Sequence, residues 1–411
     1  MLSGRSTDGW VCRPHGWLRH YAGLLGPAGT TAAGIMVRDR PGERLAAVRS
    51  SLARRHQSRQ RGLVVAPGGR MAWRDVPGPP PPGPYGATVH PLAIATCDMD
   101  RPIILAATPF PLPLHLGHEC VAEVVAVGDE VRTVSPGQKV VVPFQISCGA
   151  CPPCRLGRPG SCTGVPALSM YGFGVAGGGW GGAIADLLGV PFADEMLVGL
   201  PDGIEPEVVA SVADNVSDAY RHVAPHLPGL LAIDPAARVL ILASLQQRQA
   251  FTSSMPLYTG LIAVALGARH VEVVDARAEI RDLAARLGLQ PRSPTDLRGI
   301  EPAPLVVDVT GDPAGLVAAL GHTAADGICS SAGGLHARGR FPLLRSYISN
   351  VTLHIGRTHA RAVIPQVLEL MVDGRLHPEA VTTQVAPIDE APAALDQHCR
   401  AGAVKTILVA S

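Results

Sequence analysis

The chain contains very little lysine: Lys139 and Lys405 are its only two lysines among 411 residues. Aromatic residues make up only 4% of it, and no run of about 18 apolar residues occurs, so a membrane-spanning helix is not predicted. The formal net charge of +1 gives no electrostatic reason to expect nucleic acid or an anionic membrane as a partner. A hydrophobic content of 47% is typical of a globular chain, and the length allows two domains.

The composition and the hydrophobic pattern of the chain change at two points along its length. Residues 1–60 are rich in arginine, poor in acids and weakly periodic, which predicts a disordered extension or a mis-assigned start, with a transit peptide as the alternative. From Arg61 to about residue 205, short β-rich segments such as Cys120–Val127 are separated by Gly, Pro and Asp turns. After Glu205, strands alternate with helices, which predicts parallel βαβ units with helices on both faces of a sheet. The expected strands are Val239–Leu242, Val271–Asp275, Leu305–Val309 and Gly327–Ser331, and the expected helices are Leu257–Leu266, Ala278–Leu287 and Ala360–Val372.

Four of the nine cysteines, Cys148, Cys151, Cys154 and Cys162, follow the spacing C-x2-C-x2-C-x7-C. Four thiolates this close in sequence can surround Zn²⁺ on a loop that is too irregular to bury a core of its own. Two disulfides are disfavoured because adjacent C-x2-C pairs are too crowded for unstrained bridges, and an iron–sulfur cluster is possible on ligand type alone. A closed four-cysteine site has no open coordination position, so we expect a structural metal.

Three further residues are candidates for a second, open metal site. A catalytic zinc needs three protein ligands and a free position, and Cys97, His118 and Asp214 supply suitable atoms. Each also has an ordinary explanation on its own. Cys97 could be a small buried apolar residue, His118 a hydrogen-bonded core histidine, and Asp214 the cap of a helix that starts near Ser217.

A longer pattern connects these residues. Cys97 is followed by Leu116–Glu119, Val127–Val131, Pro136–Val141 and then the four-cysteine segment. In order and spacing this string resembles the catalytic domain of medium-chain, zinc-dependent alcohol dehydrogenases, and the similarity extends more loosely from about residue 61 to 411.

The resemblance implies a role for each candidate site residue. Cys97, His118 and Asp214 would be the ligands of a catalytic zinc, and Cys148, Cys151, Cys154 and Cys162 those of a structural zinc. Glu119 would be the carboxylate behind the catalytic ion, and Asp100 the acid that orients the histidine. Zinc would polarise the alcohol oxygen, and hydride would pass to a nicotinamide. The family's proton-relaying Ser or Thr is replaced by Met99, so the proton must leave by another route, through Asp98 or directly to solvent.

The expected dinucleotide fingerprint is missing. The family has G-x-G-x-x-G after the first strand of the cofactor domain, whereas residues 243–256 of this chain contain no glycine and form a longer turn. Two interpretations stay open: either the loop bulges outward and Ser253, Ser254 and Met255 still offer N–H groups to phosphate, or dinucleotide binding is weakened or lost.

Two charged residues bear on the choice of cofactor. Asp275 ends the second strand of the cofactor domain, where an acid accepts hydrogen bonds from a ribose, and this favours NAD over NADP. Arg277 nearby leaves NADP open. Lys405 resembles a basic residue that reaches the pyrophosphate from the C-terminal tail; an ordinary surface lysine is the alternative.

Together these features predict an α/β plus β fold. A GroES-like β-rich catalytic domain would comprise residues 61–205 and 346–411, and a Rossmann doubly wound parallel-sheet domain residues 206–345. The expected activity is zinc-dependent hydride transfer between an alcohol or polyol and NAD, with two Zn²⁺ per subunit, in a cytoplasmic homodimer or homotetramer. The alternatives are a zinc-stabilised relative that is non-catalytic or impaired in cofactor binding, and an NADPH-dependent carbonyl reductase.

Overall fold

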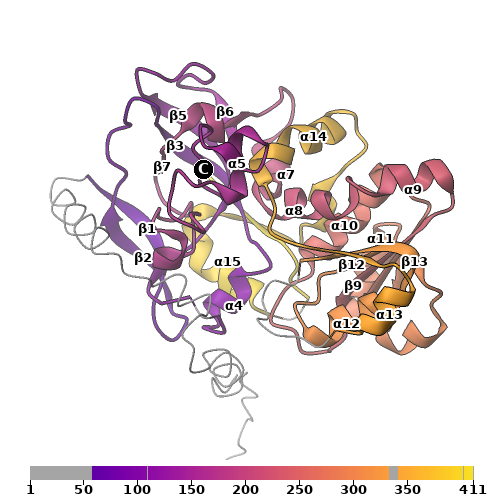
Figure 1. The fold of residues 1–411 in the computed structure, drawn as a ribbon. Helices are drawn as coiled ribbons and strands as arrows, with labels where there is room; N and C mark the ends of the chain where they lie inside the picture. The colour runs from indigo at the N-terminus through magenta and orange to yellow at the C-terminus, as the bar shows by residue number, and fades with distance from the viewer. Residues whose placement is uncertain (1–57, 109, 333–340, 401, 411) are drawn as a thin grey trace, which may run out of the picture.

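The computed structural model describes residues 58–108, 110–332, 341–400 and 402–410. Two sheet-containing halves lie next to each other, one built on β3 and β5 and the other on β9 and β12 (Figure 1). Of the predicted extension over residues 1–60, positions 1–57 lie outside the described residues, and Arg59 already begins a strand. None of the described helices has the length and apolar character needed to cross a membrane.

The first half is β-rich, as the sequence predicts. Its larger sheet has the order β15-β16-β3-β5-β6-β8, with β7 paired to β3, and its smaller sheet has the order β2-β1-β4. The apolar strand β5 pairs antiparallel with both β3 and β6, and the chain returns past Gly128, where an added Cβ would lie 1.9 Å from the carbonyl oxygen of Gly83. The strands are β1 (Arg59–Val65), β2 (Met71–Pro77), β3 (Ala87–Ala95), β4 (Leu114–His115), β5 (Glu119–Val127), β6 (Lys139–Val142), β7 (Leu188–Val190), β8 (Val198–Gly199), β15 (Gln384–Pro387) and β16 (Thr406–Val409).

The second half holds a six-stranded parallel sheet of order β11-β10-β9-β12-β13-β14. This is the 3-2-1-4-5-6 order of a doubly wound dinucleotide-binding fold, so the predicted Rossmann architecture is confirmed. Buried valines, leucines and isoleucines fill its central strands because helices cover the sheet. The strands are β9 (Arg238–Ser244), β10 (His270–Asp275), β11 (Gln290–Arg292), β12 (Ala303–Asp308), β13 (Thr323–Ser331) and β14 (Thr352–Ile355).

The helices of the first half have at most eight residues, and the longest helices of the described residues follow residue 205. Those of the first half are α4 (Asp100–Ile104), α5 (Pro152–Arg155), η2 (Pro159–Ser161), η3 (Gly174–Gly177), α6 (Ala193–Met196), η6 (Pro378–Val381), η7 (Ile388–Glu390) and α15 (Ala391–His398). The remaining ones are α7 (Pro206–Val209), η4 (Ala210–Ala213), α8 (Asn215–Val223), α9 (Leu227–Ile233), α10 (Ser254–Ala265), α11 (Ala278–Arg286), η5 (Pro294–Gly299), α12 (Pro313–Gly321), α13 (Leu343–Ile348) and α14 (Ala360–Val372).

The parallel sheet extends further along the chain than the expected boundary. Because β14 pairs with β13, the sheet runs to Ile355, past position 346 where the sequence predicts a return to the catalytic domain.

One apolar core crosses between the two halves. Val121 of β5 and Val141 of β6 belong to the same buried cluster as Val216 of α8 and Ile241 of β9. This shared core packs the η4–α8 segment against β5. The chain around residue 214 is therefore held next to the start of β5, although the two are far apart in sequence.

Candidate metal centres and cofactor site

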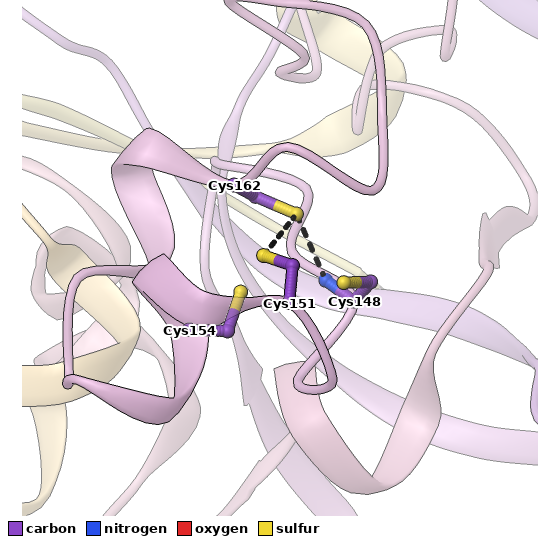
Figure 2. Close-up of side chains that lie close together, drawn as sticks. All are labelled: Cys148, Cys151, Cys154 and Cys162. Atoms are coloured by element: carbon purple, nitrogen blue, oxygen red, sulfur yellow. Dashed lines mark hydrogen bonds between the residues drawn. The ribbon is translucent and has the colours of Figure 1, made fainter.

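The four-cysteine segment lies between β6 and β7 and is shaped by the short helices α5 and η2. The sulfur atoms of Cys148, Cys151, Cys154 and Cys162 all lie within 4.8 Å of one another. They point toward a common centre (Figure 2). All four cysteines are free, and the Cys151 and Cys162 sulfurs are 3.7 Å apart, so the two-disulfide alternative is not observed.

Backbone N–H groups around this segment stabilise thiolates. The N–H of Thr163 donates to Cys151 Sγ at 3.4 Å, and the N–H groups of Cys148 and Gly164 donate to Cys162 Sγ at 3.4 and 3.3 Å. Hydrogen bonds from the backbone of Cys154 and Thr163 lower the pKa of the Cys151 thiol to about 5, whereas burial raises the pKa of the Cys154 and Cys162 thiols. Four converging sulfurs with such donors fit a tetrahedral Zn²⁺ site.

A second group of possible ligands is fully internal. Suitable atoms of Cys97, His118, Glu119 and Asp214 lie within 4.8 Å of one another, and all four residues are buried. Cys97 follows the end of β3, His118 and Glu119 lie at the start of β5, and Asp214 joins η4 to α8. The structure thus brings together the three predicted ligands and the carboxylate expected behind them.

For Asp214 and His118, the ordinary explanations are not what the structure shows, whereas Cys97 is buried as its ordinary explanation also expects. Asp214 makes no side-chain cap on α8; instead its carboxylate lies 3.4 Å from His118 Nε2. Neither ring nitrogen of His118 has a hydrogen-bond partner, and Oε1 of Glu119 has none either. Buried polar atoms without partners are costly, and a cation bound between them would satisfy His118 Nε2 and Glu119 Oε1 together.

The electrostatics of this group favour a positive charge, a proton or a metal ion, among the buried acidic groups. Burial, reinforced by Asp214 and Glu119, raises the pKa of the Cys97 thiol well above its ordinary value. Burial raises the pKa of Glu119 to about 8, although Lys405 acts in the opposite direction. Burial lowers the pKa of His118, but Asp100 and Asp214 more than offset this and bring it to about 9. The donor set of one sulfur, one imidazole nitrogen and one carboxylate oxygen suits a catalytic Zn²⁺.

Two neighbours position the ligands. Asp100 Oδ2 accepts from the N–H of Cys97 at 2.8 Å, and Asp100 Oδ1 lies 3.8 Å from His118 Nδ1 on the side away from Asp214. Asn215 Nδ2 donates to Cys97 Sγ at 3.3 Å. Asp100 was predicted here, whereas Asn215 was missed because it belongs to no spacing pattern; its place directly after Asp214 is the only sequence signal for it.

Lys405 is buried and faces the metal-site carboxylate. Its Nζ donates to Glu119 Oε2 at 2.7 Å and to Asn215 Oδ1 at 3.0 Å, and neither Lys405 nor Glu119 is exposed. Burial would lower the pKa of this ammonium, but Glu119 raises it. Lys405 is therefore not a surface lysine, and its predicted contact with a pyrophosphate stays a prediction.

Aromatic rings border the same site. The ring centroids of Phe173 and Phe144 lie 4.9 and 5.9 Å from that of His118, and Phe110 packs edge-on against Phe173 at 5.0 Å. Two of the six phenylalanines of the chain thus lie beside one imidazole, and a third packs against one of them. This apolar wall lowers the local dielectric and strengthens charge interactions at the site.

The predicted phosphate-binding N–H groups are already engaged. The backbone N–H of Ser254 donates to Asp98 Oδ1 at 3.0 Å, and that of Met255 donates to Asp98 Oδ2 at 3.1 Å. Asp275 lies at the end of β10 as expected, but Arg277 and Ser253 donate to its carboxylate. The N–H groups of Ser254 and Met255 are therefore not free in this structure, and whether they bind phosphate stays a prediction.

The glycine-free loop is fastened to the carboxyl ends of three strands. Gln247 Nε2 donates to the carbonyl of Ala276 after β10 at 2.5 Å, and Gln249 Nε2 donates to that of Thr310 after β12 at 2.9 Å. Ser244, at the end of β9, donates its hydroxyl to the carbonyl of Gln246. In doubly wound folds the ligand crevice lies at these strand ends, so the loop covers part of the expected dinucleotide path.

A family model, two known relatives and a solved structure all indicate the same family for this chain. Residues 83–202 match the model of the alcohol dehydrogenase GroES-like domain. The chain is 30% identical over 351 residues to a probable zinc-binding alcohol dehydrogenase of Mycobacterium tuberculosis, covering 80% of this chain and 83% of that protein. A glutathione-independent formaldehyde dehydrogenase of Pseudomonas aeruginosa is 34% identical over 154 residues, which are 35% of this chain and 38% of that enzyme.

A solved structure agrees over most of the chain. The alcohol dehydrogenase TADH from Thermus sp. ATN1 superposes with a TM-score of 0.75 at 29% sequence identity, covering 85% of this chain and all of that one (100%). Both halves of the fold are therefore shared with it.

Proposed function

Because the chain belongs to the zinc-binding medium-chain alcohol dehydrogenase family, we propose that it interconverts an alcohol or polyol and the corresponding aldehyde or ketone at a catalytic zinc held by Cys97, His118 and Asp214. The observation that supports this most is the convergence of these three side chains on one buried point, where neither ring nitrogen of His118 has a hydrogen-bond partner. NAD is the proposed hydride carrier, and NADP is less favoured because Asp275 is a carboxylate.

When bound, zinc supplies Lewis-acid polarisation of a substrate oxygen at its open coordination position. The residues around it perform the supporting tasks. Asp100 and Asn215 hold Cys97 through its backbone N–H and its sulfur, Asp100 also lies beside His118, and Lys405 balances the charge of Glu119. The phenylalanine wall excludes water and favours substrates with an apolar group beside the reacting carbon.

The proton of the alcohol needs a route that avoids Met99, because a thioether cannot relay it. Asp98, the alternative considered from the sequence, accepts hydrogen bonds from α10 through both of its oxygens. It can take part in proton transfer only after it leaves α10, so direct release to solvent is the proposed route in the arrangement observed.

A second candidate function is a zinc-stabilised relative with impaired cofactor binding. It is favoured by one specific observation: residues of this chain already fill the hydrogen-bonding positions expected for a dinucleotide. The groups at the start of α10 do not fit a pyrophosphate as they stand. An NADPH-dependent carbonyl reductase has no such support. A cytoplasmic location and a homodimer or homotetramer stay predictions.

Metal analysis tests the catalytic site. We expect two zinc ions per chain for the native sequence and loss of one of them in Cys97→Ser, because that substitution removes a ligand of the buried site only. Cys329→Ser is the control, since Cys329 is buried in β13 outside both groups. If Cys97→Ser retains both ions, the assignment of the catalytic site is wrong.

Cobalt substitution tests the open position without a cofactor. Co²⁺ at the catalytic site should give a visible spectrum that shifts when an alcohol or aldehyde is added, and the shift should be absent in Cys97→Ser. A cobalt spectrum that no alcohol or carbonyl compound perturbs would contradict a substrate-binding metal. Turnover is then followed as NADH formation, with NAD and NADP compared.

A further inference from the structure

We propose that Asp98 is a built-in competitor of the dinucleotide: its carboxylate occupies the place at the start of α10 where the pyrophosphate of NAD would bind. This inference rests on the proposed function, since it concerns the cofactor of that same site. It implies that the chain in the observed conformation binds NAD weakly, and that Asp98 must leave α10 before the dinucleotide can take its position.

The contacts of Asp98 are those of a bound anion. Its Oδ1 accepts from the N–H of Ser254, and its Oδ2 from the N–H of Met255, the first two residues of α10. The hydroxyls of Thr252 and Ser254 also donate to Oδ1. Backbone N–H groups and hydroxyls at a helix start are the groups that hold phosphate oxygens in dinucleotide-binding folds.

The helix itself leaves this place open to an outside anion. Ser253, the residue that precedes α10 and would normally cap it, makes no side-chain cap; its hydroxyl donates to Asp275 instead. The free N–H groups and the helix dipole of this 12-residue helix are therefore satisfied by a carboxylate from the other half of the molecule. A carboxylate seated there repels a second anion as well as blocking its hydrogen bonds.

The ribose-binding acid is engaged in the same way. Nε of Arg277 donates to Asp275 Oδ1 at 2.9 Å, and Nη2 donates to Oδ2 at 2.7 Å. Both residues are buried, and Arg277 also donates to the carbonyl of Phe251 in the glycine-free loop. The phenyl ring of Phe251 lies against Gly311, where an added Cβ would be 3.0 Å from the ring. The Asp98 contacts are thus part of a continuous set of hydrogen bonds and packing contacts that extends from α10 to the loop after β12.

Equilibrium binding of ADP-ribose, measured by calorimetry, tests the proposal. ADP-ribose carries the pyrophosphate and both riboses but no reactive nicotinamide, so the readout does not depend on catalysis. Asp98→Asn removes the charge and keeps an acceptor for the α10 N–H groups; we expect it to bind ADP-ribose at least about tenfold more tightly than the native chain. Asp98→Ala, which also removes the acceptor, should show an increase of at least this size.

The matched control is Asp194→Asn. Asp194 is also half-buried and also accepts backbone N–H groups, from Arg132 and Thr133, but it lies in the β-rich half. Its affinity for ADP-ribose should equal that of the native chain. Adenosine, which has no phosphate, should bind native and Asp98→Asn chains alike.

Three results would overturn the proposal: equal ADP-ribose affinity in the native and Asp98→Asn chains, weaker binding in Asp98→Asn, or no binding to either. Circular dichroism and zinc content establish that each variant is folded and metallated. The failure of the proposed function is separately visible, because it would appear as a cobalt spectrum insensitive to alcohols, whatever the ADP-ribose affinities are.

Discussion

At the scale of single residues, the Lys405–Glu119 pair is a fully buried contact beside the proposed metal ligands. Both side chains are completely buried, and the ammonium also bonds to Asn215, which in turn donates to Cys97. One lysine thus holds two residues that contact the catalytic site. Breaking a buried ion pair by removing one partner leaves the other charge uncompensated.

We therefore predict that Lys405→Met lowers the free energy of unfolding of the zinc-loaded chain by about 3–5 kcal/mol, measured by chemical denaturation. Lys139→Met is a natural control because Lys139 is the only other lysine and is exposed on β6; its effect should stay within about 0.5 kcal/mol. The double variant Glu119→Gln/Lys405→Met should recover part of the loss. Equal stability of the two single variants would contradict the predicted role.

A site residue could be predicted from the sequence only where it belongs to a recognisable pattern of spacing. Cys97 and His118 could be proposed as ligands because they belong to the string of motifs, and Asp214 because the family resemblance implies an acid or cysteine at its position. Asn215 and Asp98 were not, since each acts through a contact with residues more than a hundred positions away. Asp98 was considered only as a proton carrier, because nothing in the local sequence shows that it meets α10.

At the scale of secondary-structure elements, the loop that carries four cysteines depends on a glycine that is not a ligand. A Cβ on Gly164 would lie 2.5 Å from Cys148 Sγ, and the Gly164 N–H donates to Cys162 Sγ. Any side chain at this position must displace a sulfur. The four sulfur atoms can therefore keep their positions only if residue 164 has no side chain.

Gly164→Ala should accelerate zinc release from this loop by roughly tenfold or more, as expected for a change that disturbs the surroundings of the ligands. The rate is measured with a chromogenic chelator in the Cys97→Ser background, so that only the four-cysteine site contributes. Gly199→Ala on β8 serves as the comparison, because an added Cβ there meets no atom within 4 Å. Indistinguishable release rates would show that the sulfur positions tolerate the methyl group.

Strands and helices were predictable where the apolar pattern was strong, and the loop after β9 was not. The helix predicted over Ala360–Val372 is α14 with the same bounds, because its apolar spacing is regular along its whole length. In residues 243–253, Gln247 and Gln249 donate to backbone carbonyls that follow other strands. Such long-range side-chain contacts have no periodicity, so the sequence left two conformations open.

At the scale of the whole molecule, the buried metal site links stability to pH. In the metal-free chain the pKa of Glu119 is raised from 4.5 to about 8 by burial, and that of His118 from 6.5 to about 9 by its acidic neighbours despite burial. A group whose pKa is raised on folding stabilises the fold at low pH. That stability is lost as the pH rises through the folded-state value.

The metal-free chain should therefore become less stable between about pH 5 and 9, whereas bound zinc takes the place of these protons. We predict that the difference in unfolding free energy between zinc-loaded and metal-free chains widens with pH, by roughly 1–2 kcal/mol per unit near pH 7–8. Thermal or chemical unfolding across this range, without free zinc, provides the measurement. In Glu119→Gln the widening should be smaller, and a difference that stays constant with pH would refute the linkage.

Because the chain has only two lysines, amine-reactive reagents can report on two defined positions of the folded molecule. Lys139 is exposed, whereas Lys405 is shielded on all sides and paired with Glu119. In the native state a reagent of this kind should modify Lys139 and leave Lys405 untouched. The rate of Lys405 acylation, measured by mass spectrometry, then reports how often the buried region around Lys405 opens to solvent. Acylation of Lys139 in the same polypeptide is the internal standard.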